Sequence, residues 1–179
     1  MPPMASPQQL TLVVRENCKR ERRASLAQAM EMHLHICKTG LQSHGLVGNY
    51  LVPMLASYGS MSHAQKAFDL LVYKKELTLS SLIIGYAKHS DDPQHAFLLY
   101  KKMQDNDGIH ANAQLYLALI KACTKWKYVE KGHEIYGDIS RCGMLDSNVY
   151  VSSALVTMFV RCGCLDKARE VFDKQPSVV

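Results

Sequence analysis

Apolar residues recur along this chain at the spacing of a helix rather than that of a strand. One stretch has apolar residues at i, i+3, i+4 and i+7: Leu51, Met54, Leu55 and Tyr58. This spacing places them on one face of an α-helix. A Tyr-Gly-Ser break follows, and glycine suits the left-handed position after a helix end. The apolar pattern then resumes and runs to Phe68, so it predicts two helices joined by a tight turn.

The same helix–turn–helix pattern recurs along the sequence. The segment 48–69 is repeated at 152–173, where seven residues are identical: Leu51/Leu155, Val52/Val156, Met54/Met158, Gly59/Gly163, Ala64/Ala168, Phe68/Phe172 and Asp69/Asp173. Similar outlines occupy 78–103 and 115–143, and a weaker one lies at 10–40. One hairpin cannot bury its apolar stripe alone, so neighbours must stack. The pattern predicts an all-α solenoid of about five repeats, each about 35 residues long.

Composition agrees with one repeat domain that spans 1–179. Apolar residues make up 47% of the 179 residues and charged residues 21%, which permits a sizeable core. The net charge of +5 permits an anionic partner without demanding one. No apolar run approaches the roughly 18 residues that a membrane helix needs, so we expect no membrane insertion.

The six cysteines form no Cys-x-x-Cys pair, and we expect reduced, mostly buried thiols. His33 and Cys37 stand at i, i+4 and could share a metal on a helix, but a structural role is the favoured interpretation. Cys162 and Cys164 flank a glycine, and for them too the turn explains the pattern better than a metal or redox site. We therefore expect no metal and no cofactor.

Catalytic patterns are missing from the sequence. It has no His-x-Glu followed by Pro-Cys-x-x-Cys, no glycine-rich phosphate loop and no nucleophile elbow, so we expect a binding protein rather than an enzyme. Two further sequence features are each compatible with a role in RNA binding and with a purely structural role. The basic run at 19–23 could contact phosphates or form a solvated loop. Trp126 could stack on a base or pack against protein.

The repeated segments resemble the pentatricopeptide repeat family, in particular its plant-type subclass with alternating P, L and S motifs. The stretches LVGNYLVPMLASYGSMSHAQKAFD and VYVSSALVTMFVRCGCLDKAREVFD resemble the S motif, and LTLSSLIIGYAKHSDDPQHAFLLYKKMQDNDGIHAN resembles the P motif. A tetratricopeptide array is the nearest alternative, but its Trp-x-x-Leu-Gly start does not recur here. The implied fold is a right-handed α-α superhelix. The implied order is L (8–44), S (45–75), P (76–112), L (113–148) and S (149–179).

The resemblance implies binding of single-stranded RNA in a mitochondrion or chloroplast, although no transit peptide is visible in this chain. In this family the fifth and last residues of a repeat read one base, and the second residue packs against it. In the P repeat these residues are Ser80, Asn112 and Leu77. The Ser80/Asn112 pair resembles the family's adenine-reading combination, because a hydroxyl and an amide match a purine's donor and acceptor edge.

The other repeats carry less typical residues at the same positions. The implied RNA contacts are Asn49 and Lys75 in the first S repeat, Asn148 in the second L repeat and Ser153 in the second S repeat. Leu117, which pairs with Asn148, cannot hydrogen-bond a base. The alternative function is therefore a scaffold, which holds other protein subunits through exposed repeat ends and lacks sequence-specific RNA binding.

Overall fold

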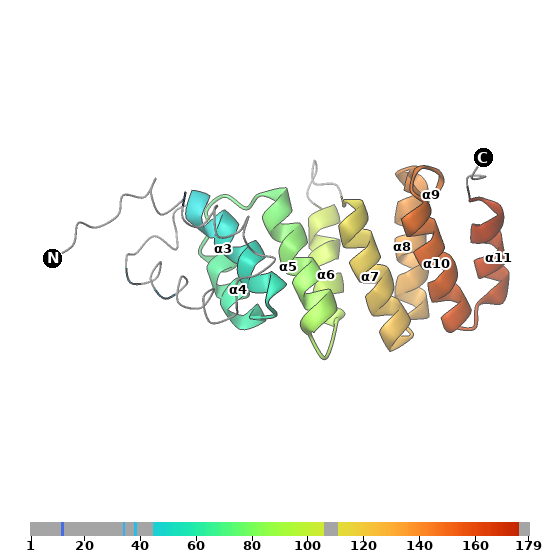
Figure 1. Cartoon of the computed structure of the whole chain (residues 1–179), viewed down its shortest axis with the longest axis horizontal. Helices are drawn as coiled ribbons and strands as arrows, with labels where there is room; N and C mark the ends of the chain where they lie inside the picture. Colours follow the sequence, from blue (N-terminus) through green and yellow to red (C-terminus); the bar gives the residue numbers. More distant parts are fainter. Residues whose placement is uncertain (1–11, 13–33, 35–37, 39–44, 106–110, 176–179) are drawn as a thin grey trace. The chain divides into compact units, whose positions relative to one another are not determined.

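The computed structural model describes residues 12, 34, 38, 45–105 and 111–175, and most of these residues are in α-helices. Nine helices and no strand occur in these residues, which confirms the predicted all-α class. The chain divides into two compact units, Met1–Ser90 and Asp91–Val179. The helices of both units are labelled in Figure 1.

The first unit contains three described helices: α3 (Gly45–Ser57), α4 (Met61–Asp69) and α5 (Glu76–His89). Helix α3 packs against both α4 and α5. The α3–α4 turn has Gly59 in the left-handed region, with φ of 76°, as the Tyr-Gly-Ser break predicts. Helix α5 lies very close to its neighbours at Gly85, where an added Cβ would stand 2.8 Å from the sulfur of Met61 and 2.9 Å from the Cβ of Ala56. Only glycine fits at this contact without a shift of the neighbours.

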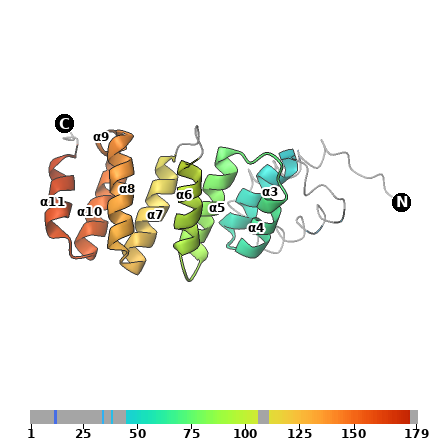
Figure 2. The same cartoon turned by 180° about the vertical axis from the view of Figure 1, so that it is seen from behind.

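The second unit contains the remaining helices. They are α6 (Gln94–Gln104), α7 (Ala113–Trp126), α8 (Val129–Arg141), the short α9 (Met144–Ser147), α10 (Val149–Arg161) and α11 (Leu165–Asp173). Helix α7 packs against α8 and α10, and α10 packs against α11. Within this unit α7 and α10 form one layer, and α8 lies behind them in Figure 1 and in front of them in Figure 2. The layers are those of stacked helical hairpins.

Helices α8 and α10 approach each other at a small residue, which faces the flexible end of the Met158 side chain. An added Cβ on Gly132 would lie 2.7 Å from Cε of Met158. Gly132 holds the place in its repeat that Ala64 and Ala168 hold in theirs, where both alanines are buried. Large apolar side chains fill the core of this unit, and those that are almost fully buried are Met103, Leu115, Leu119, Ile120, Ile135, Ile139, Leu155 and Phe159.

The first helices begin where the four later repeats are expected to begin, at Gly45, Glu76, Ala113 and Val149. Each of these repeats holds two longer helices. The weaker repeat 8–44, including the basic run at 19–23 and the pair His33/Cys37, lies outside the described residues apart from positions 12, 34 and 38.

The expectation of mostly buried thiols is wrong for the described cysteines. Cys123 is buried in α7, but Cys142 is exposed, and Cys162 and Cys164 are half-exposed. The physical reason is their position at helix caps, where fewer neighbouring residues cover a side chain than in the middle of a helix. In the described ranges no three His, Cys, Asp or Glu side chains group as a metal site would need. Nor is any helix there long and apolar enough to cross a membrane.

Candidate nucleic-acid interface

Two of the predicted RNA contacts are the N-cap residues of helices. The side-chain oxygen of Asn112 accepts a hydrogen bond from the backbone N–H of Leu115, at 2.9 Å, at the start of α7. Asn148 accepts one from Val151, at 3.2 Å, at the start of α10. Asparagine is a preferred N-cap because its oxygen satisfies a backbone N–H that the helix leaves without a partner. The last residue of one repeat therefore fixes the first helix of the next.

Lys75 stands at the same place before α5, but a lysine side chain has no acceptor with which to cap a helix. Asn49 in α3 supplies the acceptor instead. Its Oδ1 accepts from the backbone N–H of Lys75, at 3.2 Å, and from the hydroxyl of Thr78, at 2.5 Å. Its Nδ2 donates to the carbonyl of Tyr73, at 3.1 Å. The buried amide of Asn49 thus holds the start of α5 against α3, a role that the sequence did not indicate.

Ser80 and Leu77 stand three residues apart on α5 but differ in exposure. Ser80 is 1% exposed, whereas Leu77 is largely exposed. The hydroxyl oxygen of Ser80 is the one buried side-chain N or O atom without a hydrogen-bond partner in the part of the chain that the structure describes. A buried hydroxyl without a partner costs about 1–3 kcal/mol of stability. A base can reach this hydroxyl only after the side chains that cover it move.

Ser153 lies on the exposed surface of α10, where Gln175 donates a long hydrogen bond of 3.5 Å to its hydroxyl. One turn further along α10 comes Thr157, and one turn beyond it Arg161. On α7 the half-buried Leu117 is followed at the same spacing by Lys121 and Lys125. Residues four apart share a helix face. The fifth residues of these two repeats are Leu117 and Ser153. Leu117 therefore shares its helix face with two lysines, and Ser153 shares its face with a threonine and an arginine.

These faces meet at a shallow hollow of about 460 Å³ between α7 and α10. We call it the α7–α10 hollow, and its lining residues are Ile120, Lys121, Thr124, Lys125, Ala154, Thr157 and Arg161. No carboxylate of the described residues forms an ion pair with Lys121, Lys125 or Arg161, although Lys125 lies over the ring of Trp126, 5.0 Å from its centre. The hollow thus presents three positive charges and no negative one.

Sequence reasoning did not find this hollow. The i, i+4 pair of Lys121 and Lys125 is visible in the sequence, and it could have marked a basic helix face. The contribution of Arg161 depends on how α10 packs against α7, which no local pattern gives. The structure brings Ser153 onto the helix face that leads into the hollow. Asn112 and Asn148 lie instead at the N-termini of the two helices that form it.

Comparison with known proteins identifies the repeat. The family model described as PPR repeat matches residues 115–144 and 150–174, which cover most of α7, α8, α10 and α11. A mitochondrial pentatricopeptide repeat-containing protein of Arabidopsis thaliana is 34% identical over 148 residues, or 83% of this chain and 23% of that protein. The chloroplastic protein CRR2 of the same plant is 32% identical over 149 residues, or 83% of this chain and 22% of its own length.

The chain therefore spans less than a quarter of the length of these two relatives. Similarity nevertheless extends over most of this chain, beyond the two segments that the family model matches. The structure agrees with the family match and with the similarity to these relatives, because its helical hairpins repeat a glycine turn and a small residue in the second helix. We conclude that the chain contains repeats of the PPR family, at residues 115–144 and 150–174.

Proposed function

We propose that this chain binds single-stranded RNA in a mitochondrion or chloroplast and contributes to RNA processing, editing, stability or translation there. PPR repeat proteins are generally organelle RNA-binding proteins. The relatives described above are named as mitochondrial and chloroplastic proteins. We also propose that the repeats follow the order L–S–P–L–S of the plant-type subclass in one continuous domain.

The α7–α10 hollow is the observation that carries this proposal. Phosphate contacts supply most of the affinity in sequence-independent RNA binding, and they need cations that no protein carboxylate neutralises. Lys121, Lys125 and Arg161 meet this condition in the described structure. In the proposed complex they hold the RNA backbone, while Ser153, one turn before Thr157, faces a base.

Base recognition in the P repeat is assigned to Ser80 and Asn112, with Leu77 packing against the base. The hydroxyl of Ser80 has no partner among the described residues, so a base that reaches it repays the cost of its burial. The amide nitrogen of Asn112 is available as a donor while its oxygen caps α7. Asn148 has the same arrangement before α10. Asn49 and Lys75 act together at the start of α5, where the ammonium group of Lys75 adds positive charge.

Fluorescence anisotropy with labelled single-stranded RNA tests the proposal. The test variant removes the three cations of the hollow by Lys121→Gln, Lys125→Gln and Arg161→Gln. The charge-matched control changes exposed cations elsewhere, by Lys66→Gln, Lys101→Gln and Arg169→Gln. We expect the intact chain to bind at low salt, with an affinity that falls as salt rises. The slope of the logarithm of the binding constant against the logarithm of the salt concentration measures the number of phosphate contacts. We expect this slope to become less steep by about 0.7 for each phosphate contact that the test variant loses.

Two results would contradict the proposal. One is the absence of RNA binding by the intact chain at low salt. The other is an equal loss of affinity in the test variant and the charge-matched control, because this would show a diffuse attraction without a site. Circular dichroism of each variant separates loss of binding from loss of structure.

A scaffold function is the second candidate, and exposed apolar side chains on α10 and α11 favour it. Tyr150, Leu165 and Phe172 are all largely exposed. Large apolar side chains at the surface are available for contacts with another protein. Cross-linking of the chain within organelle extracts, through a photoreactive residue at position 165, would detect such a partner. Two results together would favour the scaffold over the RNA-binding function. They are recovery of a protein partner from ribonuclease-treated extract and failure of the chain to bind RNA.

A further inference from the structure

A second groove lies in the other helix layer of the second unit, between α6 and α8. One part has a volume of about 610 Å³ and adjoins a part of about 330 Å³, and both are lined by Phe97, Lys101 and Lys131. The two parts share these three side chains, and together we call them the α6–α8 groove. Its helices α6 and α8 lie in front in Figure 2, and none of its lining residues belongs to the α7–α10 hollow.

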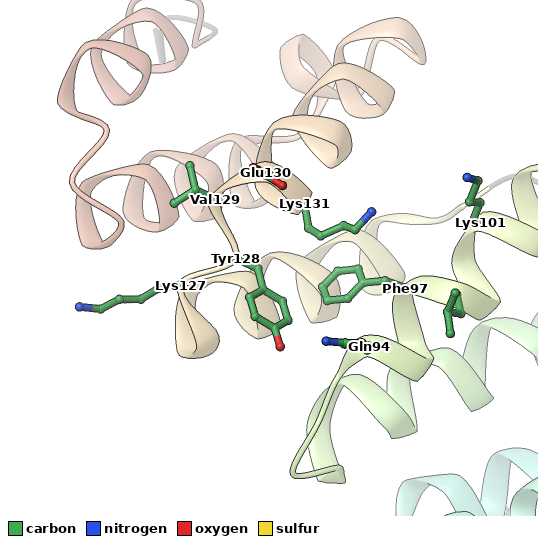
Figure 3. A pocket seen from close by; sticks show the side chains of 9 residues that line it. Gln94, Phe97, Lys101, Lys127, Tyr128, Val129, Glu130 and Lys131 are labelled. Carbon is green, nitrogen blue, oxygen red and sulfur yellow. The ribbon is translucent and has the colours of Figure 1, made fainter.

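The larger part has an apolar floor. The rings of Phe97 and Tyr128 lie side by side in Figure 3, with centres 6.1 Å apart and planes tilted by 56°. Phe97 is 7% exposed, whereas Leu98 beside it is largely exposed. An apolar side chain placed here would bury Leu98 and complete the contacts of the two rings. The floor does not suit a stacked base, since Phe97 offers almost no open ring face.

The charges around this floor are mainly positive. Lys101 and Lys127 have no ion-pair partner within the described ranges, whereas Lys131 is paired with Glu134 at 2.7 Å. Glu130 is the single carboxylate of the larger part. Two cations, on opposite sides of the two rings in Figure 3, are thus available to incoming acidic groups.

The two carboxylates at the other end, Glu134 and Asp138, already have partners, and that of Glu134 is Lys131. Asp138 accepts a hydrogen bond from the hydroxyl of Tyr100, at 2.8 Å, and from the side-chain nitrogen of Gln104, at 2.5 Å. It also forms an ion pair with Arg141. A negatively charged ligand in the groove therefore meets little uncompensated negative charge at this end.

Lys127 has an unusual backbone conformation for its residue type. Its φ is 54°, which makes it the one non-glycine residue with positive φ in the described structure. The corresponding turns between the first and second helices of other repeats have Gly59 and Gly163, with φ of 76° and 82°. A side chain in this conformation is strained, and such strain is retained mainly at functional sites. The strained turn places the Lys127 side chain among the residues that line the groove.

We propose that the α6–α8 groove binds an acidic peptide segment of a partner protein. One apolar side chain of the peptide lies on Leu98 and Tyr128, beside the buried ring of Phe97, and flanking carboxylates pair with Lys101 and Lys127. The charge of the groove selects acidic over basic segments, and its apolar floor selects segments that carry a leucine or a similar side chain. This site is separate from the proposed RNA contacts, so RNA and peptide occupy different layers of the same unit.

The probe is a fluorescein-labelled peptide in which one leucine is flanked by glutamates, and fluorescence polarisation with the full chain measures its binding. Matched peptides replace the glutamates by lysines or the leucine by alanine. The test variant is Lys101→Glu with Lys127→Glu, and the control is Lys121→Glu with Lys125→Glu, which changes the net charge equally. We expect the test variant to bind about tenfold or more weakly and the control to change affinity less than about twofold. Lys127→Gly, which keeps the turn and removes the side chain, must also weaken binding.

Several results would overturn the proposal. They are no binding of the acidic peptide up to a concentration on the order of 1 mM, equal binding of the lysine-substituted peptide, or an equal loss in test and control variants. Displacement of the peptide by single-stranded RNA from the intact chain but not from the Lys121→Glu, Lys125→Glu variant would also overturn it, because the peptide would then occupy the α7–α10 hollow. Helix content and melting temperature confirm that each variant is folded.

Discussion

Phe68 and Phe172 hold the same place in their repeats, yet Phe68 is 6% exposed and Phe172 is 62% exposed. Helix α4, which contains Phe68, packs against α5, and Nζ of Lys74 lies 5.2 Å from the centre of the Phe68 ring. Helix α11, which contains Phe172, packs on α10, and the residues that it buries there are Ala168 and Val171. Identical residues at equivalent positions thus make different contributions to the fold.

We expect Phe68→Ala to lower the free energy of unfolding by about 3–4 kcal/mol, because it removes a buried ring and leaves a cavity. Phe172→Ala should lower it by less than about 0.5 kcal/mol, because the ring is mostly in water already. Urea denaturation followed by circular dichroism measures both. Equal losses in the two variants would show that α11 is covered in solution by a contact such as self-association, and dilution of the sample would reveal it.

Lys127→Gly should stabilise the chain by about 1 kcal/mol, because glycine adopts positive φ without the strain that a side chain brings. The reverse change at the matching turn, Gly163→Ala, should destabilise it by about 1 kcal/mol. No atom would lie within 4 Å of the new Cβ at Gly163, so the loss measures backbone strain alone. The melting temperature should rise in Lys127→Gly and fall in Gly163→Ala, relative to the original chain. A loss of stability in Lys127→Gly would contradict the strain assigned to this turn.

Glu170 should make stability depend on pH in the acid range. Lys167 and Lys174 contact its carboxylate at 2.6 Å and 2.9 Å, and the hydroxyl of Tyr136 donates to it at 3.1 Å. These hydrogen bonds lower the pKa of Glu170 to about 2 from the ordinary value of 4.5. Since the folded state has the lower pKa, this stabilisation is present above pH 4.5 and is lost as the pH falls toward 2.

Carboxyl carbon chemical shifts measured by NMR during an acid titration report the pKa of Glu170 directly. Urea denaturation at several pH values should show that Glu170→Gln removes part of the acid dependence of stability. Glu134, whose carboxylate has a single lysine partner, provides a matched control through Glu134→Gln. A titration midpoint near 4.5 for Glu170 would contradict the role of the three donors.

Cysteine reactivity should differ sharply between α7 and the end of α8. Burial raises the pKa of the Cys123 thiol to about 12, so the thiol is protonated and covered at neutral pH. Cys142 is exposed at the end of α8. A short pulse of iodoacetamide at about pH 8, followed by peptide mass spectrometry, should modify Cys142 first and Cys123 only after denaturation. Early modification of Cys123 would show that α7 opens readily.

Local patterns predicted the repeats well, because helix and turn positions depend on neighbouring residues. Gly59 and Gly163 have the positive φ that their turns require, and the repeated pair Ala64 and Ala168 is buried. The second-helix glycine, Gly132, could have been found by aligning its repeat with Ala64, but its contact with Met158 depends on tertiary packing.

The candidate site was harder to predict than the fold. Alignment with the repeat motif shows which position of a repeat a residue occupies. It does not show which other residues are its hydrogen-bond partners. Asn49 illustrates this, because its partners Thr78 and Tyr73 lie in or just before the next repeat. The α7–α10 hollow illustrates it as well, since Arg161 and Lys121 approach each other only through the packing of two helices.

Asn112 offers the most direct test of RNA recognition, because one substitution separates its two roles. Asn112→Asp keeps the oxygen that caps α7 and removes the amide donor, so stability should stay within about 0.5 kcal/mol of the original. Asn112→Ala removes both functions and should cost about 1 kcal/mol. The measurement is the affinity of each chain for four single-stranded RNAs that differ at one base. We predict a preference for adenine in the original chain and its loss in Asn112→Asp at an unchanged melting temperature; an identical base preference in all three chains, or no RNA binding at low salt, would contradict the account.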